Sequence, residues 1–249
     1  GNYLAKFAVK VMPEKQEEKE KHKHLKYLKP IDTGVDAVIG TSAMYLEGTR
    51  KEIARMLDMA RVNVDRSFHA FIHADSGAIK DVEEREAYID YLNKEISRAI
   101  SKMMIHETNE KNSKNIGSYF EMTGNIERIG DHAVNICDYT NLLQENQIKF
   151  SNDAIREMQE MREICSHMFE RLKRAPENPK EWLEKIHDSE NIVDKKTDEF
   201  YENHLERIRK GTCNDEACII FSEMLTDFER IGDHLWNIAQ EMGKIIERN

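Results

Sequence analysis

The stretch NIERIGDHAVNI at positions 125–136 recurs, with small changes, as DFERIGDHLWNI at positions 227–238. Both copies contain Glu-Arg-Ile-Gly-Asp-His and then, after two further residues, Asn-Ile. A glycine inside a helix costs about 1 kcal/mol relative to alanine, so helix stability alone does not account for the string. The repetition therefore indicates an internal duplication whose copies share a role beyond packing.

A second, weaker recurrence supports the same division of the chain. REAYIDYL at 85–92 resembles SENIVDKK at 189–196. The Glu and Asp of these two strings lie 104 positions apart, close to the 102 positions that separate the first pair of strings. Two recurrences at nearly one offset predict a tandem duplication of a single structural unit.

Apolar residues recur every three or four positions from about residue 35 onward, which predicts long amphipathic helices rather than strands. The low aromatic content of 8% agrees with helices. We therefore predict an all-α fold of two tandem antiparallel three-helix bundles, the first in residues 35–147 and the second in residues 148–249. The expected helices span about 35–74, 78–110, 114–147, 151–174, 179–210 and 214–247.

Residues 1–34 are expected to precede the bundles as a membrane-proximal stub and a charged linker. The stub, YLAKFAVKVM at 3–12, is short and apolar on one side. The linker, PEKQEEKEKHKH at 13–24, has mixed charge and no apolar periodicity. There is no secretory signal and no run of about 18 apolar residues, so we expect no membrane-spanning helix in this chain.

Composition argues against several classes of function. The net charge of −10 excludes a broad basic surface for nucleic acid. The four cysteines, Cys137, Cys165, Cys213 and Cys218, have the spacing of neither a zinc site nor a disulfide framework, which favours a reducing, cytosolic compartment.

Catalytic motifs are also missing from the sequence. There is no glycine-rich phosphate loop and no nucleophile elbow, so we expect no enzyme. The best enzymatic rival is a carboxylate-bridged di-iron oxidase, which needs inward-facing Glu-x-x-His pairs. The spacing in this chain is Glu-x-x-x-Asp instead.

Each of the four recurring strings places Glu and Asp four residues apart, and therefore on one helix face. Near 127–131 the apolar stripe lies well away from this face, so the carboxylates should form outer ridges. Converging carboxylates repel each other unless a cation neutralises them, and oxygen-only ligands suit Mg²⁺, Ca²⁺, Mn²⁺ or iron. We predict metal ligands at Glu86, Asp90, Glu127, Asp131, Glu190, Asp194, Glu229 and Asp233.

Several neighbouring residues have weaker claims as ligands. The histidines His132 and His234 are turned by about 100° from the motif aspartates, and we expect them to support the ligands or mark the boundary of the core. The pair His69 and His73 has a spacing that can chelate zinc, but we interpret it as a surface pair. The glycines of the two hexapeptides, Gly130 and Gly232, should allow another helix to approach closely.

The duplicated string Asn125-x-Glu-Arg-Ile-Gly-Asp-His, with its upstream Glu-x-x-x-Asp, resembles the PhoU family of phosphate-transport regulators. The resemblance covers about residues 35–247. It implies two three-helix bundles whose acidic motifs bind multinuclear metal clusters, with iron or zinc expected first and magnesium, manganese and nickel as further candidates. Asn125 and Asp227 occupy the same place in the two repeats and would be peripheral ligands of unequal character.

The apolar stub, the linker and LKYLKP at 25–30 resemble a junction in bacterial sodium–phosphate cotransporter-related proteins. This implies a metal-binding regulatory domain at the cytoplasmic face of the bacterial plasma membrane. Its partner would be the transporter's membrane domain in cis, with phosphate a candidate ligand and homo-oligomerisation left open. The alternatives are a free-standing PhoU-type regulator of phosphate uptake and signalling, and a metal-free helical interaction scaffold.

Overall fold

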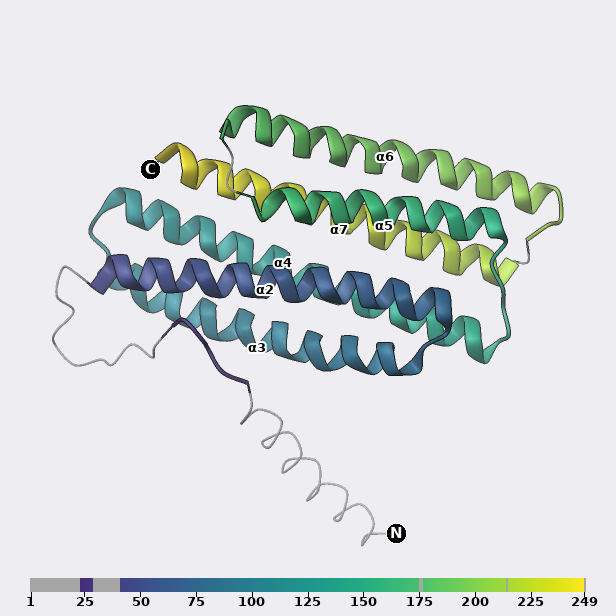
Figure 1. Cartoon of the computed structure of the whole chain (residues 1–249), viewed down its shortest axis with the longest axis horizontal. Helices are drawn as coiled ribbons and strands as arrows, with labels where there is room; N and C mark the ends of the chain where they lie inside the picture. Colours follow the sequence, from purple (N-terminus) through teal and green to yellow (C-terminus); the bar gives the residue numbers. More distant parts are fainter. Residues whose placement is uncertain (1–22, 29–40, 175–176, 214, 249) are drawn as a thin grey trace, which may run out of the picture.

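The structure is a computed structural model that describes residues 23–28, 41–174, 177–213 and 215–248. Within these ranges all regular structure is helical, and there is no strand, which confirms the all-α prediction (Figure 1). The helices are α2 (Thr41–His73), α3 (Ser76–His106), α4 (Glu110–Glu145), α5 (Asn152–Leu172), α6 (Pro179–Arg209) and α7 (Asp215–Arg248).

The helix ends follow from capping residues that the sequence displays. Ser151 accepts a hydrogen bond from the Ala154 N–H at the start of α5, and Asn178 caps α6 with Pro179 next to it. Gly211 ends α6 with a φ of +65°. The expected helix start at 35 and the apolar stub at 3–12 lie outside the described residues.

The six helices run roughly along one long axis in two sets, with α2, α3 and α4 in one set and α5, α6 and α7 in the other (Figure 1). Each set packs internally, as the duplication predicts. The two sets also pack on each other, chiefly through α4 against α7 and secondarily through α2 against α5. The buried apolar residues form one cluster that crosses this boundary, so the two bundles share a core.

The predicted apolar stripes supply that core. Ile126, Ile129 and Ala133 of α4 are fully buried, and so are Phe228 and Ile231 of α7. Burying one large apolar side chain stabilises a fold by roughly 1.5–3 kcal/mol. Because these stripes face the core, the motif carboxylates on other faces of the same helices are directed outward.

Residues 23–28 pack against α2 and α3, although the sequence favoured a linker up to residue 24. Leu28 is buried, and the Tyr27 N–H donates to Oε1 of the buried Glu52 at 2.5 Å. A Cβ at Gly48 would lie 2.7 Å from the Tyr27 carbonyl oxygen. Glycine is therefore required at position 48 for this close approach.

No helix in the described ranges is both long enough and apolar enough to cross a membrane.

Candidate metal centres and the seam between the repeats

The first acidic cluster (Glu86, Asp90, Glu127 and Asp131) joins α3 and α4. Burial raises the pKa of Glu86, and the charges of Asp131, Asp90 and Glu127 raise it further. Burial and the same neighbouring aspartates also raise the pKa of Glu127. The four predicted side chains thus lie near enough for their charges to repel, but no three of them bring carboxylate oxygens within 4.8 Å of one another.

Basic side chains offset part of this repulsion. Lys94 forms an ion pair with Asp90, with 2.7 Å between Nζ and Oδ2. Lys23 donates to the Ala87 carbonyl at 2.7 Å, and its charge opposes the rise in the pKa of Glu86. The first cluster therefore contains its own cations at its edge.

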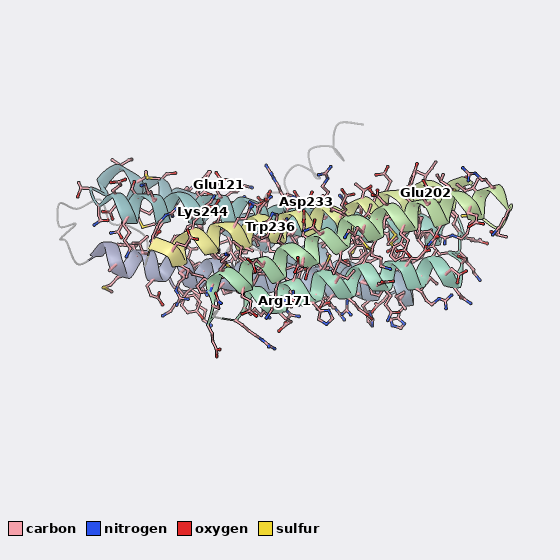
Figure 2. The ribbon with its side chains drawn as sticks, turned by 90° about the horizontal axis from the view of Figure 1, so that it is seen from above. Glu121, Arg171, Glu202, Asp233, Trp236 and Lys244 are labelled. Atoms are coloured by element: carbon pink, nitrogen blue, oxygen red, sulfur yellow. The ribbon has the colours of Figure 1, made fainter. Side chains whose placement is uncertain are left out.

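The second acidic cluster (Glu190, Asp194, Glu229 and Asp233) joins α6 and α7. Carboxylate oxygens of Glu190, Asp194 and Asp233 lie within 4.8 Å of one another. Burial raises the pKa of Glu190, and Asp194 raises it further. Figure 2 shows Asp233 near the middle of the long axis, beside Trp236. Three carboxylates at this spacing are compatible with oxygen ligands of one cation.

A fifth carboxylate, Asp198, lies near the second cluster and was not among the residues predicted from the sequence. Burial and the charge of Asp233 raise the pKa of both Asp194 and Glu229, and Asp198 makes a smaller contribution in the same direction. Asp198 follows Asp194 by four residues in α6, so it lies on the same helix face. That spacing is the signal that could have identified it.

The motif glycines lie where the paired helices approach each other. A Cβ at Gly232 would lie 3.1 Å from Cγ1 of Val193, so the absence of a side chain permits the contact of α7 with α6. At Gly130 the nearest atoms, on Ile89, would be 3.5 Å away, which is an ordinary contact. The expected close approach is therefore confirmed at Gly232 and is less tight at Gly130.

The interface of α4 with α7 carries two matching polar groups, which we call the seam. On one side Asp227 Oδ1 lies 2.6 Å from His132 Nδ1 and accepts a hydrogen bond from Asn135 Nδ2 at 3.1 Å. The corresponding residues of the other repeat are His234, Asn237 and Asn125. Asn125 Oδ1 lies 2.9 Å from His234 Nδ1 and 3.3 Å from Asn237 Nδ2.

The two seam histidines stack on each other, with ring centroids 5.5 Å apart. Burial lowers the pKa of His234 to about 4, with smaller contributions from His132, Arg128 and Arg230, so His234 is neutral at neutral pH. Asn125 and Asp227 are thus bound across the seam. This arrangement does not support their expected role as peripheral metal ligands.

The other candidate residues remain outside both clusters. His69 and His73 are exposed, with ring centroids 4.4 Å apart, and Asp75 lies 3.6 Å from His69. Trp182 packs in the core and donates to the Arg171 carbonyl at 3.0 Å. The contacts of His69 and His73 agree with the expected surface pair, and Trp182 acts as a packing residue.

The fold and site define a class: a duplicated three-helix protein with an outward acidic cluster on each repeat. A family model described as the PhoU domain matches residues 53–140 and again residues 158–242, one match in each repeat. The chain belongs to the PhoU family.

Curated relatives and solved structures agree with this membership. The chain is 23% identical over 195 residues to "Phosphate-specific transport system accessory protein PhoU homolog 1" of Thermotoga maritima, covering 78% of this chain and 83% of the relative. It is 25% identical over 202 residues to a PhoU homolog of Zymomonas mobilis, covering 78% and 82%.

The likeness to solved structures concerns the fold. A crystal structure of the phosphate transport system regulatory protein PhoU from Streptococcus pneumoniae superposes with a TM-score of 0.73 at 13% identity, over 82% of this chain and 96% of that one. PhoU from Pseudomonas aeruginosa gives a TM-score of 0.67 at 19% identity, over 82% and 98%.

Proposed function

We propose that this protein is a PhoU-type regulator of phosphate transport that acts as an accessory protein to a phosphate transporter. The observation that carries the proposal is the family match in both repeats, each of which contains one acidic cluster. The relatives from Thermotoga maritima and Zymomonas mobilis are named as accessory proteins and align over 83% and 82% of their own length.

These relatives favour a separate regulator over the transporter domain in cis. The transporter-domain reading rests on the apolar stub at 3–12, which lies outside the described residues. In either arrangement the protein would act through a partner that transports phosphate, and no catalytic step is required of it.

The two acidic clusters are the proposed metal sites. Support comes from their convergence across paired helices and from the raised pKa of carboxyls in both, which means that the charged forms are held at a cost in free energy. A bound cation would remove that cost. Iron or zinc is expected first, with magnesium, manganese and nickel as further candidates, and open coordination positions would face solvent, where phosphate oxygens could bind.

Metal analysis tests the sites directly. Protein purified without chelator is compared by mass spectrometry with a variant in which Glu127, Asp131, Glu229 and Asp233 are replaced by alanine. The matched control is Glu121→Ala, since Glu121 is an exposed carboxylate of α4 outside the clusters. Two or more metal equivalents should be present in wild type and control and lost in the variant. Equal metal content in all three proteins would contradict the assignment.

Phosphate uptake tests the regulatory role. A strain that lacks this protein should take up phosphate differently from its parent when the phosphate supply changes, and the wild-type gene should restore the parental response. The quadruple alanine variant should fail to restore it while Glu121→Ala succeeds. An unchanged response in the deletion strain, at both low and high phosphate, would refute the regulatory proposal whatever the metal analysis shows.

A further inference from the structure

A third cluster of potential ligands lies where α6 turns into α7. It consists of His204 on α6, Cys213 in the turn and Cys218 in the first part of α7. One ring nitrogen of His204 and both sulfur atoms lie within 4.8 Å of one another. His204 is ten residues beyond Asp194 in α6, which places this cluster about 15 Å along the helix from the second acidic cluster.

His204 is more than a packing residue. Only 2% of it is exposed, and its ring stacks on Phe221 at 4.4 Å between centroids. Its Nδ1 lies 3.4 Å from a guanidinium nitrogen of Arg207, whereas its buried Nε2 has no hydrogen-bond partner within the described ranges. Burial lowers the pKa of His204 and hydrogen bonding with the Cys218 backbone opposes this, yet Nε2 has no partner at hydrogen-bond distance in the described part of the chain, which is rare for a buried polar atom.

The turn brings the two sulfurs to within 4.8 Å of a ring nitrogen of His204. Gly211 adopts a φ of +65°, and Thr212 donates from both its N–H and its Oγ1 to the Arg207 carbonyl at 3.0 Å. These bonds fold the chain back directly before Cys213. Cys218 lies near the amino-terminal end of α7, where the helix dipole favours the thiolate form of a cysteine.

We propose that His204, Cys213 and Cys218 bind one thiophilic divalent metal ion, Zn²⁺ in the first place, with water in the fourth position. Two thiolates and one imidazole form a known type of zinc ligand set, and the two thiolates balance the charge of the ion. The nearby Arg207 is itself balanced by Glu157, whose two oxygens lie 2.9 and 2.6 Å from its guanidinium nitrogens.

The site differs in chemistry from the acidic clusters. Its sulfur and nitrogen donors select zinc or cobalt over magnesium and manganese, whereas oxygen-only clusters accept the harder ions. Both cysteines are partly exposed, so an ion can reach them from solvent. A metal there would join α6, the turn and α7 through three side chains.

Cobalt(II) titration under reducing conditions isolates this site. A thiolate bound to Co²⁺ gives a charge-transfer absorption that carboxylate ligands do not give, so the acidic clusters are silent in this measurement. The full chain, freed of metal and held in a phosphine reductant, should develop the band to one equivalent. Added Zn²⁺ should then remove the band by displacing cobalt.

Substitutions of Cys213 and Cys218 test whether these two thiolates produce the charge-transfer band of bound Co²⁺. Cys213→Ser and Cys218→Ser should each weaken Co²⁺ binding by roughly tenfold or more. The matched control is Cys137→Ala, since Cys137 is buried outside the turn, and Asp194→Asn tests independence from the second acidic cluster; both should keep the band.

Three results would overturn the proposal: no charge-transfer band in the wild type, a band that survives both serine variants, or a band lost in Asp194→Asn. Circular dichroism of each variant shows whether a loss reflects unfolding. If a variant unfolds, mass mapping of cysteines protected by Zn²⁺ from alkylation in the wild type replaces it. Protection of Cys213 and Cys218 supports the site, and equal labelling with and without Zn²⁺ refutes it.

Discussion

The two halves of the molecule place different side chains at one corresponding position beside their acidic clusters. In the first half Lys94 follows Asp90 by four residues and forms an ion pair with it at 2.7 Å. In the second half Asp198 follows Asp194 by four residues and raises the pKa of Asp194, after burial and Asp233. At this position the first cluster has a cation and the second an anion, although Arg230 pairs with Asp233 of the second cluster at 3.0 Å.

This difference teaches that duplicated geometry does not imply equal chemistry. Each cluster uses the same four motif positions, yet beside them the second has Asp198 where the first has Lys94. We therefore expect the second cluster to bind a divalent cation more tightly than the first. The seam shows the same pattern, because Asp227 faces one histidine and Asn125 faces the other.

The largest expected effect comes from exchanging the charges at this position. Asp198→Lys should weaken Mn²⁺ binding at the second cluster by about 100-fold, because two units of charge change beside a dication. Lys94→Asp should strengthen binding at the first cluster. Calorimetric titration of metal-free protein measures both, with Asp198→Asn as the shape-preserving control. Equal Mn²⁺ affinities at the two clusters of the wild type would contradict the expected tighter binding at the second cluster.

A smaller effect concerns the stability of the seam at acidic pH. The folded pKa of His234 is about 4, below its ordinary value of 6.5, so the unfolded chain binds a proton first as the pH falls. The stability that His234 contributes is therefore present above pH 6.5 and is lost progressively as the pH falls toward about 4. At about pH 5 the loss amounts to roughly 2 kcal/mol.

The cluster carboxyls act in the opposite direction. Their folded pKa values are raised, so their contribution is favourable below their ordinary pKa and is lost as the pH rises through the folded value. The variant His234→Gln separates the two effects. Urea unfolding at pH 7 and pH 5 should show a smaller acid-induced loss in the variant than in the wild type, and equal losses would contradict the assigned pKa.

Asn125→Asp should make the two sides of the seam alike. The new carboxylate would face His234 as Asp227 faces His132, and an opposite charge at hydrogen-bond distance favours the protonated imidazole. The pKa of His234 should rise from about 4 by about one unit or more. Two-dimensional NMR titration of the imidazole measures it, and an unchanged pKa would show that the side chain turns away from the seam.

The smallest expected effect compares the two motif glycines. Gly130→Ala should raise the free energy of unfolding by up to about 1 kcal/mol, because alanine favours the helix and its Cβ meets Ile89 only at 3.5 Å. Gly232→Ala should gain less or lose stability, because its Cβ meets the buried Val193 at 3.1 Å. Chemical denaturation of both variants measures the difference, and a larger gain at Gly232 would reverse the expected order.

Much of the fold could be predicted because capping residues and apolar periodicity are visible in the sequence. Ser151 and Asn178 start helices, and Gly211 ends one, as their chemistry requires. The predicted apolar stripes of α4 and α7 are buried. Two further caps, Asp75 and Asn109, start α3 and α4 earlier than the apolar pattern alone indicated, since capping side chains satisfy the first N–H groups before the stripe begins.

The seam could not be predicted, because one helix does not reveal which surface of another helix it will meet. The facing positions His132 and Asp227 are 95 residues apart. The acidic clusters could be predicted because their Glu-x-x-x-Asp strings recur in both repeats. Asp198 could not be predicted in this way, because the first repeat has Lys94 at the corresponding position. The spacing of Cys213 and Cys218 was not interpreted as a metal site in the sequence, because their third partner, His204, lies before the turn and joins them only in the folded chain.

The seam has a consequence for how the molecule is held together. Across it α4 offers α7 the same kinds of groups that α7 offers α4, which is the self-complementary pattern of a symmetric homodimer. Residues 146–151 connect the two halves, so their association is an intramolecular event with a high effective concentration. The protein therefore has the architecture of a symmetric dimer, but its two halves associate independently of the protein concentration because one chain connects them.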